Sequence, residues 1–181
     1  MRWDPPDSGQ TRLRDEFLTH LERGGSSLRR DGHPAHLTAG VVVLDPGLRW
    51  VLLTHHRKAG AWFQFGGHLE SGDDTVHAAA AREAGEESGL ADLDVRPGVV
   101  HLDRHVLPAS FRPCREHLDV RFAAIAPTMG RPSVGDESTD VRWWPVNGLP
   151  PGAAADLGAL VAAATAHLRA EPAPAAGVPC C

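Results

Sequence analysis

The segment from Gly66 to Leu90 constrains the fold of this chain more than any other. Its first part, Gly66-Gly67-His68-Leu69-Glu70-Ser71-Gly72, is rich in glycine, and its second part contains four consecutive alanines at 78–81. Alanine is the strongest helix former, and Gly89 stands where a glycine commonly ends a helix. The segment therefore predicts a glycine-rich loop that leads into a helix over residues 74–88.

Strands are expected on both sides of this loop and helix. Residues 37–44 and 50–54 are largely apolar or β-branched and flank Asp45-Pro46-Gly47, which predicts a hairpin. Similar runs predict strands at 99–106, 118–125 and 141–146. The chain has 181 residues, about the size of one domain, so the mixture of helices and strands predicts a single α/β domain.

Both ends of the chain are expected to lie outside the sheet. Apolar residues recur at four-residue spacing between 13 and 21, which predicts an amphipathic helix that begins at Thr11 and ends at Gly24-Gly25. A last helix is expected over residues 153–169, and a tail rich in proline and alanine follows it. The predicted divisions are an N-terminal helix and connection (1–36), a main domain (37–169) and a flexible C-terminal tail (170–181).

Three glutamates on the central predicted helix form a carboxylate cluster. Glu83, Glu86 and Glu87 stand at i, i+3 and i+4, so Glu83 shares one helical face with both others. In a cleft of effective dielectric ~20, two such charges ~5.5 Å apart repel by roughly 3 kcal/mol. A bound cation relieves this repulsion, and oxygen ligands without a thiolate favour Mg²⁺ or Mn²⁺. The alternative is a solvated helix face with Arg82 and Arg115 as neutralising neighbours.

The charge balance and the cysteines exclude several classes of protein. Asp and Glu total 23 against 18 for Lys and Arg, so no nucleic-acid partner is expected. No apolar run approaches the roughly 18 residues of a membrane span, and the N-terminus lacks the apolar core of a signal peptide. We therefore expect no membrane partner and a cytoplasmic location. Cys114 and His117 have Cys-x-x-His spacing, but without a Cys-x-x-Cys pair the sequence does not favour a zinc site.

The segment from Gly67 to Leu90 resembles the Nudix box. That motif runs Gly, five residues, Glu, seven residues, Arg-Glu, an apolar residue, any residue, Glu-Glu, any residue, Gly and an apolar residue. Arg82-Glu83-Ala84-Gly85-Glu86-Glu87-Ser88-Gly89-Leu90 matches its second half at every specified position. In the first half Asp73 replaces the usual Glu, and eight residues separate it from Arg82, so either Asp73 or Asp74 is expected to take that role.

The resemblance implies both a fold and a reaction. The implied fold is an α/β/α sandwich with a mixed β-sheet between helices, in which residues 37–169 form the Nudix hydrolase domain and the N-terminal helix is an addition. The implied activity is that of a diphosphatase with Mg²⁺ or Mn²⁺ as cofactor, a hydrolase of phosphorus-containing anhydrides that cleaves the diphosphate linkage of a small nucleoside diphosphate derivative. Members of the family are often homodimers, so a homodimer is a further expectation.

The resemblance also assigns roles to residues of the box. The implied metal ligands are Gly67, through its carbonyl, Glu83, Glu86 and Glu87. Structural roles are implied for Gly66, Arg82 and Gly89. Glu86 is the first candidate for the base that deprotonates the attacking water, and Glu83 and Glu87 share the catalytic site with it. Glu137, on a predicted loop, and Glu116 are the alternative bases, although Glu137 also fits a simple polar turn.

Substrate-binding candidates lie close to the glycine-rich loop. Arg57 and Lys58 follow the second predicted strand and are expected to contact phosphate, with a solubilising role as the alternative. Trp62 is expected either to stack on a base or to lie in the core. His68 is expected to touch phosphate or to lie at the surface.

Two other functions share this sequence pattern. A Nudix-fold nucleotide sensor or regulator without turnover is the main alternative, and the presence of all three box glutamates argues against it. An isoprenyl diphosphate isomerase needs a catalytic Cys and Glu pair, and Cys114 stands in no recognisable motif of that kind.

Overall fold

The structure is a computed structural model of the chain, and it describes residues 3–22, 28, 34–109, 112 and 114–170. Gly24-Gly25, the predicted end of the first helix, lies outside the described residues, as does nearly all of the predicted tail. The elements in chain order are α1 (Ser8–Glu22), β1 (Ala35–Leu44), β2 (Trp50–His56), β3 (Ala61–Phe63), β4 (Phe65–His68), α2 (Val76–Ser88), β5 (Asp94–Val95), β6 (His101–Val106), β7 (Glu116–Ile125), β8 (Ser138–Pro145) and α3 (Leu157–Ala170).

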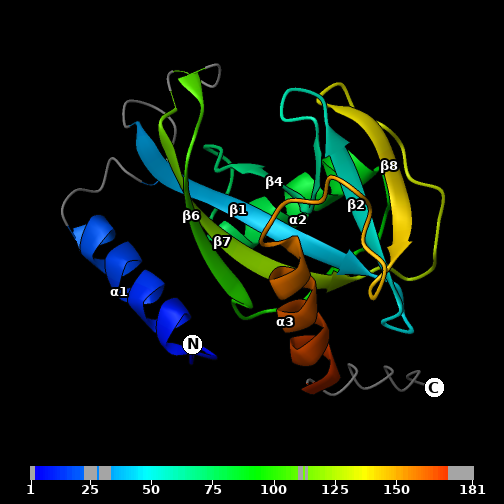
Figure 1. The fold of residues 1–181 in the computed structure, drawn as a ribbon, viewed down its shortest axis with the longest axis horizontal. Coiled ribbons are helices and arrows are strands. Elements are labelled where there is room, and N and C mark those ends of the chain that lie inside the picture. The colour runs from blue at the N-terminus through cyan, green and yellow to red at the C-terminus, as the bar shows by residue number, and fades with distance from the viewer. Residues whose placement is uncertain (1–2, 23–27, 29–33, 110–111, 113, 171–181) are drawn as a thin grey trace, which may run out of the picture.

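The eight strands form one mixed sheet around β1 (Figure 1). β1 pairs in parallel with β7 along its whole length, from Ala35 opposite Glu116 to Leu44 opposite Ile125. All other strand pairs are antiparallel, and they join β1 to β2 and β4, β2 to β3 and β8, and β7 to β5 and β6. The sheet therefore brings β4, which carries the glycines, directly against the central strand.

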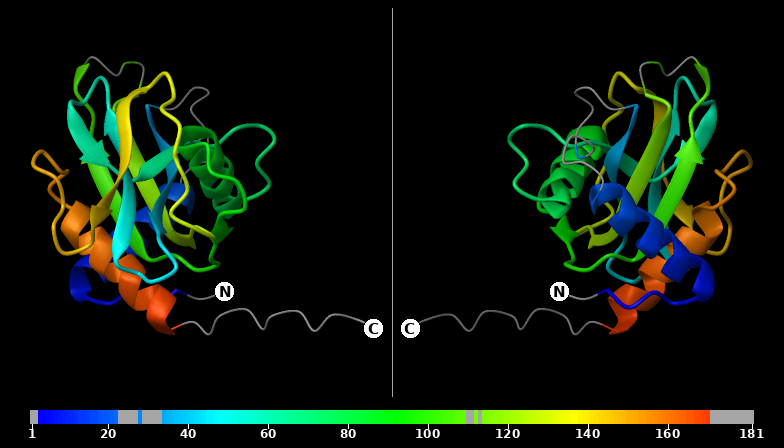
Figure 2. Two further views of the ribbon diagram at one scale, coloured as in Figure 1. Left: turned by 90° about the vertical axis from the view of Figure 1, so that its right-hand side faces the viewer. Right: turned by 90° about the vertical axis from the view of Figure 1, so that its left-hand side faces the viewer.

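Alternate residues of β1 divide the core between two helices. Val41 and Val43 pack with the buried alanines of α2, whereas Val42 and Leu44 pack with the apolar side of α3. Side chains on a strand point alternately to its two faces, which explains why nine of the ten β1 residues are buried. Figure 2 shows α2 and α3 on opposite sides of the sheet. The predicted α/β/α sandwich with a mixed sheet is confirmed.

The added N-terminal helix packs beside β6. Phe17 is buried against side chains of β1, β6 and β7, including Leu102. The side-chain amide of Gln10 donates to the carbonyl of Leu102 (3.0 Å) and accepts from its N–H (2.8 Å). The helix begins at Ser8 rather than Thr11, because the Asp7 carboxylate accepts a hydrogen bond from the N–H of Gln10 and caps the first turn.

Other element boundaries also differ from the prediction. The last helix begins at Leu157 instead of residue 153, and strands β3, β4 and β5 were not predicted. The predicted hairpin exists, but β1 and β2 pair with each other only next to the turn, where Val43 lies opposite Leu52. The turn between them is held by the Asp45 carboxylate, which accepts from the N–H groups of Arg49 and Trp50, both at 2.6 Å.

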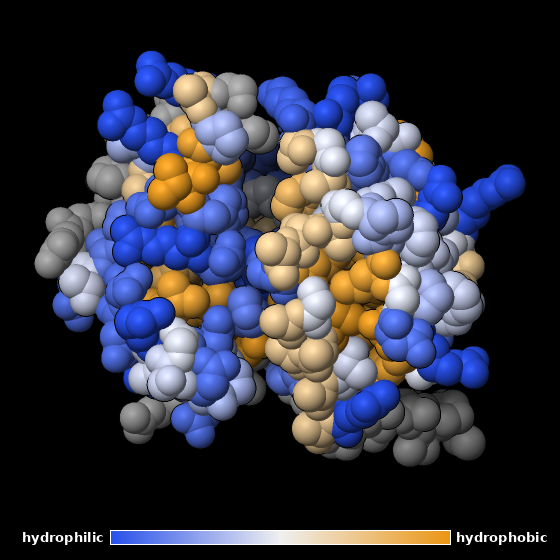
Figure 3. Space-filling model, in the orientation of Figure 1, coloured by the Kyte–Doolittle hydropathy of each residue, from blue (hydrophilic) through white to orange (hydrophobic). Residues whose placement is uncertain are grey.

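The outer surface of the molecule differs between its two sides. In the orientation of Figure 3, hydrophobic colours gather over α3 and its neighbourhood, and the α1 and β6 side is largely hydrophilic. Among the described residues, no helix is both long and apolar enough to span a membrane. The cytoplasmic location stays a prediction.

Candidate functional site

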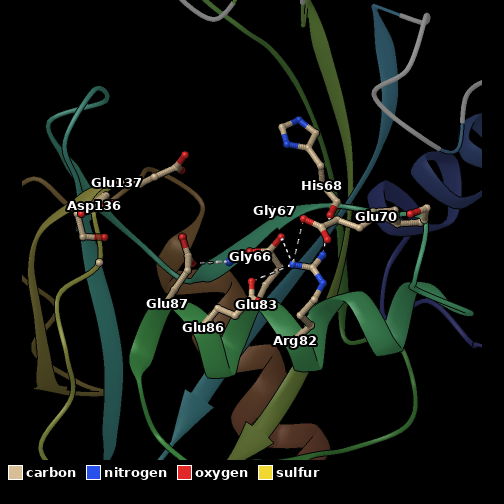
Figure 4. Close-up of a pocket in the computed structure, with 14 residues that line it drawn as sticks. Gly66, Gly67, His68, Glu70, Arg82, Glu83, Glu86, Glu87, Asp136 and Glu137 are labelled. Atoms are coloured by element: carbon tan, nitrogen blue, oxygen red, sulfur yellow. Dashed lines mark hydrogen bonds and ion pairs between the residues drawn. The ribbon is translucent and has the colours of Figure 1, made fainter.

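A polar cavity of about 600 Å³ opens between β4, α2 and the loop before β8. Figure 4 shows its glutamates on α2 facing the glycines of β4, with Asp136 and Glu137 on the opposing loop. The lining residues are Gly66, Gly67, His68, Leu69, Glu70, Ser71, Arg82, Glu83, Glu86, Glu87, Gly135, Asp136, Glu137 and Ser138. The structure thus gathers most of the candidate residues predicted from the sequence into one cavity.

Helix α2 presents the glutamates because its other side is anchored. The hydroxyl of Thr75 accepts from the N–H of Ala78 (3.0 Å) and caps the helix start. Gly89 ends the helix with φ 65°, a left-handed conformation that glycine adopts without strain. The buried alanines of α2 pack on the sheet, so the carboxylates emerge toward β4.

The double glycine allows β4 to approach its neighbours closely. A Cβ on Gly66 would lie 2.5 Å from the carbonyl oxygen of Ala39, on the central strand. A Cβ on Gly67 would lie 2.4 Å from Oε1 of Glu83. The N–H of Gly66 donates to the Glu87 carboxylate at 3.0 Å. Glycine at position 66 therefore lets β4 approach β1, and glycine at position 67 lets the Glu83 carboxylate rest against the backbone of β4.

Arg82 connects the helix to the glycine-rich loop. Its guanidinium donates to both oxygens of Asp73 (3.2 and 2.9 Å), to the carbonyl of His68 (3.0 Å), and to Glu83 and Glu86 (3.0 and 3.1 Å). A planar guanidinium suits such forked contacts with a carboxylate. Asp73 also accepts from the N–H of Glu70 (2.8 Å), so Asp73, rather than Asp74, joins the loop to Arg82.

Burial makes two of the glutamates harder to ionise. Burial, together with the charges of Glu83 and Glu137, raises the pKa of Glu87 to about 7, although the hydrogen bond from the Gly66 N–H lowers it. Burial likewise raises the pKa of Glu83, although Arg82 lowers it. The side chain of Glu83 is 15% exposed and that of Glu86 is 62% exposed. Partly buried carboxylates that disfavour their own charge are stabilised by a nearby cation.

The donor set fits a hard divalent cation. Glu83 lies so close to Gly67 that no side chain fits between them, and the Glu87 carboxylate accepts from the Gly66 N–H, so both carboxylates lie in one wall of the cavity. All these donors are oxygens, which Mg²⁺ and Mn²⁺ prefer. Among the described residues, Arg82 is the one basic side chain in the wall other than His68, so the acidic groups outnumber it.

The NUDIX domain model matches residues 34–164, which is more than half of the chain. This chain belongs to the NUDIX family. No match was found among the curated proteins. The N-terminal boundary of the match lies close to β1, in agreement with α1 as an addition to the family domain.

Solved structures of Nudix proteins share the fold. A NUDIX-family hydrolase from Clostridium perfringens is 22% identical with a TM-score of 0.61, covering 74% of this chain and 97% of that one. An Ap4A hydrolase of C. elegans, in a binary complex, is 19% identical with a TM-score of 0.59 and the same coverages. An ADP-ribose pyrophosphatase from Streptococcus suis is 21% identical with a TM-score of 0.53, covering 75% and 93%.

The loop that faces the Nudix helix is held by Arg57. The Arg57 guanidinium donates to the carbonyls of Asp136 (3.1 Å) and Ser138 (2.7 Å), and its N–H donates to the carbonyl of Glu137 (2.8 Å). Arg57 thus supports the loop that carries Glu137, a contact that the sequence did not predict because it joins segments about 80 positions apart in the chain. Glu116 instead pairs with Arg104 and is not among the residues that line the cavity.

The remaining substrate candidates of this Nudix domain lie in different surroundings. Lys58 is exposed in the turn after β2. Trp62 is only 9% exposed and packs in the core beneath α3, with the Trp144 ring 5.4 Å away. His68 is among the residues that line the cavity from the end of β4, but its ring points away from the glutamates (Figure 4).

Proposed function

We propose that this protein is a Mg²⁺-dependent hydrolase that cleaves the diphosphate linkage of a nucleoside diphosphate derivative. The observation that carries the proposal is the cavity in which Glu83, Glu86 and Glu87 of the Nudix helix face the double glycine of β4. A cavity of about 600 Å³ is within the usual range for small-molecule sites. Its acidic wall suits a substrate that arrives with, or meets, a divalent metal.

Glu83, Glu86, Glu87 and the carbonyl of Gly67 would hold the metal. Mg²⁺, or Mn²⁺ in its place, would offset the charge of the phosphates and lower the pKa of a bound water. This assignment agrees with the all-oxygen donor set and with the raised pKa of Glu87, since a cation reverses the effect of burial on that carboxyl.

Other residues of the site would accept the proton of the attacking water or hold the glutamates in position. Glu86 is our first candidate to accept the proton of the attacking water, because its carboxylate is far more exposed to the cavity than that of Glu83. Glu137 is the second, because it faces Glu87 from the opposing loop. Arg82 is a positioning residue that holds Glu83 and Glu86, and Arg57 positions the Glu137 loop.

The surroundings of the cavity and the similar structures indicate a class of substrate. Arg57 and Lys58 follow the end of β2, and the Arg57 guanidinium contacts the loop that carries Glu137, so we keep both residues as candidates for a contact with phosphate. The names of the similar structures, an Ap4A hydrolase and an ADP-ribose pyrophosphatase, support a small nucleotide with linked phosphates. We further propose a cytoplasmic enzyme, with a homodimer as an open expectation and no nucleic-acid partner.

The test is product release from a panel of nucleoside diphosphate derivatives with Mg²⁺. We expect turnover of at least one member, and a loss of about 10²-fold or more in kcat for Glu86→Gln if Glu86 is the base. Glu116→Gln is the matched control, because Glu116 pairs with Arg104 away from the cavity and should keep full activity. Nucleotide binding without turnover by any panel member would refute the hydrolase and favour the sensor.

A further inference from the structure

Three histidines and one cysteine meet at a second site on the other face of β4. They are His36 of β1, His68 of β4, His117 of β7 and Cys114 just before β7. One ligand atom from each lies within 4.8 Å of those of all the others. These residues are far apart in the sequence, and the sheet brings them together.

Strand register explains why the three histidines share a face. His36 stands directly opposite His117 in the parallel pair of β1 and β7, and His68 stands opposite Thr38 on β1. Gly67, the residue before His68, faces Glu83 on α2. Successive strand residues point to opposite faces, so the His68 ring points away from the glutamates, as Figure 4 shows. The cluster is therefore separate from the glutamate cavity.

The four side chains lie close enough together to surround one metal ion. The three imidazole rings form a nearly equilateral triangle, with centroid separations of 5.0, 5.1 and 5.1 Å. Sγ of Cys114 lies 3.7 Å from Nε2 of His68. Zinc bonds of about 2.0–2.1 Å to nitrogen and about 2.3 Å to sulfur, in tetrahedral geometry, require a sulfur–nitrogen separation of about 3.6 Å. That edge already has the required length.

The donor atoms of this cluster favour a different metal from the one expected at the glutamate site. His36 is fully buried and Cys114 is 5% exposed, while His68 and His117 are half-buried. Imidazole and thiolate are the preferred ligands of Zn²⁺, whereas Mg²⁺ takes oxygen. Four protein ligands fill a tetrahedral coordination shell and leave no position for substrate, which is typical of a structural site.

We propose that His36, His68, Cys114 and His117 together bind one structural Zn²⁺. The ion joins the start of β1, the end of β4 and the segment that leads into β7. His68 follows Gly67 directly, and its carbonyl accepts from Arg82, so the zinc site fixes the backbone that Arg82 also holds. The proposal does not depend on the hydrolase activity, because none of its ligands is a Nudix-box glutamate.

Cobalt substitution tests the site. The background is Cys180→Ser/Cys181→Ser, which leaves Cys114 as the chain's single thiol. After chelator treatment, one equivalent of Co²⁺ should produce a thiolate-to-cobalt charge-transfer band and intense tetrahedral d–d bands, and Zn²⁺ should abolish both. Adding Cys114→Ser should remove the charge-transfer band, and adding His117→Asn should weaken Co²⁺ affinity at least about tenfold.

Two control variants separate this site from others. His55→Asn should leave the spectrum unchanged, because His55 contacts Thr139 at the far side of the sheet. Glu86→Gln should also leave it unchanged, since oxygen ligands yield a weakly absorbing six-coordinate Co²⁺ without a thiolate band. A charge-transfer band that survives Cys114→Ser, or its absence in the background protein, would overturn the proposal.

A measurement on the same background protein does not require the ligand variants to fold. Stoichiometric Zn²⁺ should slow the alkylation of Cys114 at least tenfold, and excess Mg²⁺ should not. An alkylation rate that Zn²⁺ does not change would count against the site as well.

Discussion

Gly66 and Gly67 are adjacent, yet alanine at the first position should lower stability and alanine at the second should lower metal binding and activity. At Gly66 the new Cβ would meet two backbone atoms of β1, the carbonyl oxygen of Ala39 at 2.5 Å and Cα of Gly40 at 2.9 Å. Gly66 also has φ 153°, which L residues rarely adopt. At Gly67 the three atoms nearest to the new Cβ all belong to the carboxylate of Glu83, which is the end of a side chain and can rotate away.

The magnitudes follow from what has to move. Carbon–oxygen approaches in sheets are about 3.3 Å at the closest, so Gly66→Ala would have to displace β4 from β1 by about 0.8 Å. Overpacking costs about 1–3 kcal/mol and the backbone strain about 1–3 kcal/mol, which sum to about 2–6 kcal/mol. For Gly67→Ala we expect less than about 1 kcal/mol of lost stability, because only a side chain moves. Displacement of the Glu83 carboxylate by about 1 Å should instead lower kcat about 10²-fold.

Urea denaturation and Mn²⁺ binding distinguish the two effects, and neither measurement needs a substrate. Gly66→Ala should lower the urea midpoint strongly. Gly67→Ala should keep the midpoint and weaken Mn²⁺ binding, measured by electron paramagnetic resonance, together with turnover of whichever panel member is cleaved. Equal destabilisation by the two variants, or a Gly67→Ala protein with unchanged Mn²⁺ affinity and turnover, would refute the reasoning.

Two further predictions concern stability. The pKa of Glu87 is about 7 in the folded protein, against 4.5 for an unperturbed carboxyl, so between these pH values the folded state binds more protons than the unfolded state. The free energy of unfolding should therefore fall as pH rises from 4.5 to 7, by at most about 3 kcal/mol. Urea midpoints of the metal-free protein should show this slope, and a slope that persists in Glu87→Gln would contradict the assignment. Arg121 is buried among the carboxylates of Asp103, Asp119 and Asp156. Arg121→Met should therefore cost about 3–5 kcal/mol in urea denaturation, and a cost below about 1 kcal/mol would be inconsistent with a buried ion network.

Local signals predicted the Nudix helix well. The alanines and Gly89 fix α2 between its N-cap at Thr75 and its left-handed C-cap, as the glycine-rich loop and helix pattern indicated. The glutamate spacing on one helix is likewise a local property, so their common cavity could be expected from the sequence. The early start of α1 had a local signal too, since Asp7 and Gln10 have the spacing of a capping box, although the prediction placed the start at Thr11.

Features that depend on strand pairing could not be predicted in the same way. β4 contains two glycines in four residues, a composition that disfavours strands, and it is extended because it pairs with β1. Trp62 could be assigned to the core or to the substrate from sequence, and its burial follows from its contacts with Trp144 of β8 and with Ala153, in the segment before α3. The contact between Arg57 and the Glu137 loop likewise depends on the pairing of β2 with β8.

The short strand β4 is where the two proposed metal sites are kept apart. Gly67 faces the carboxylates of α2, and the next residue, His68, faces the imidazoles of β1 and β7. Because the side-chain period of a strand is two, a shift of β4 by one residue against β1 would exchange these faces. It would place the His68 ring toward Glu83 and move Gly67 into the histidine cluster. The register of β4 therefore has to be fixed for either site to form. The close contact of Gly66 with Ala39 and Gly40 opposes the shift that would bring Phe65 to this position, since only a glycine fits there.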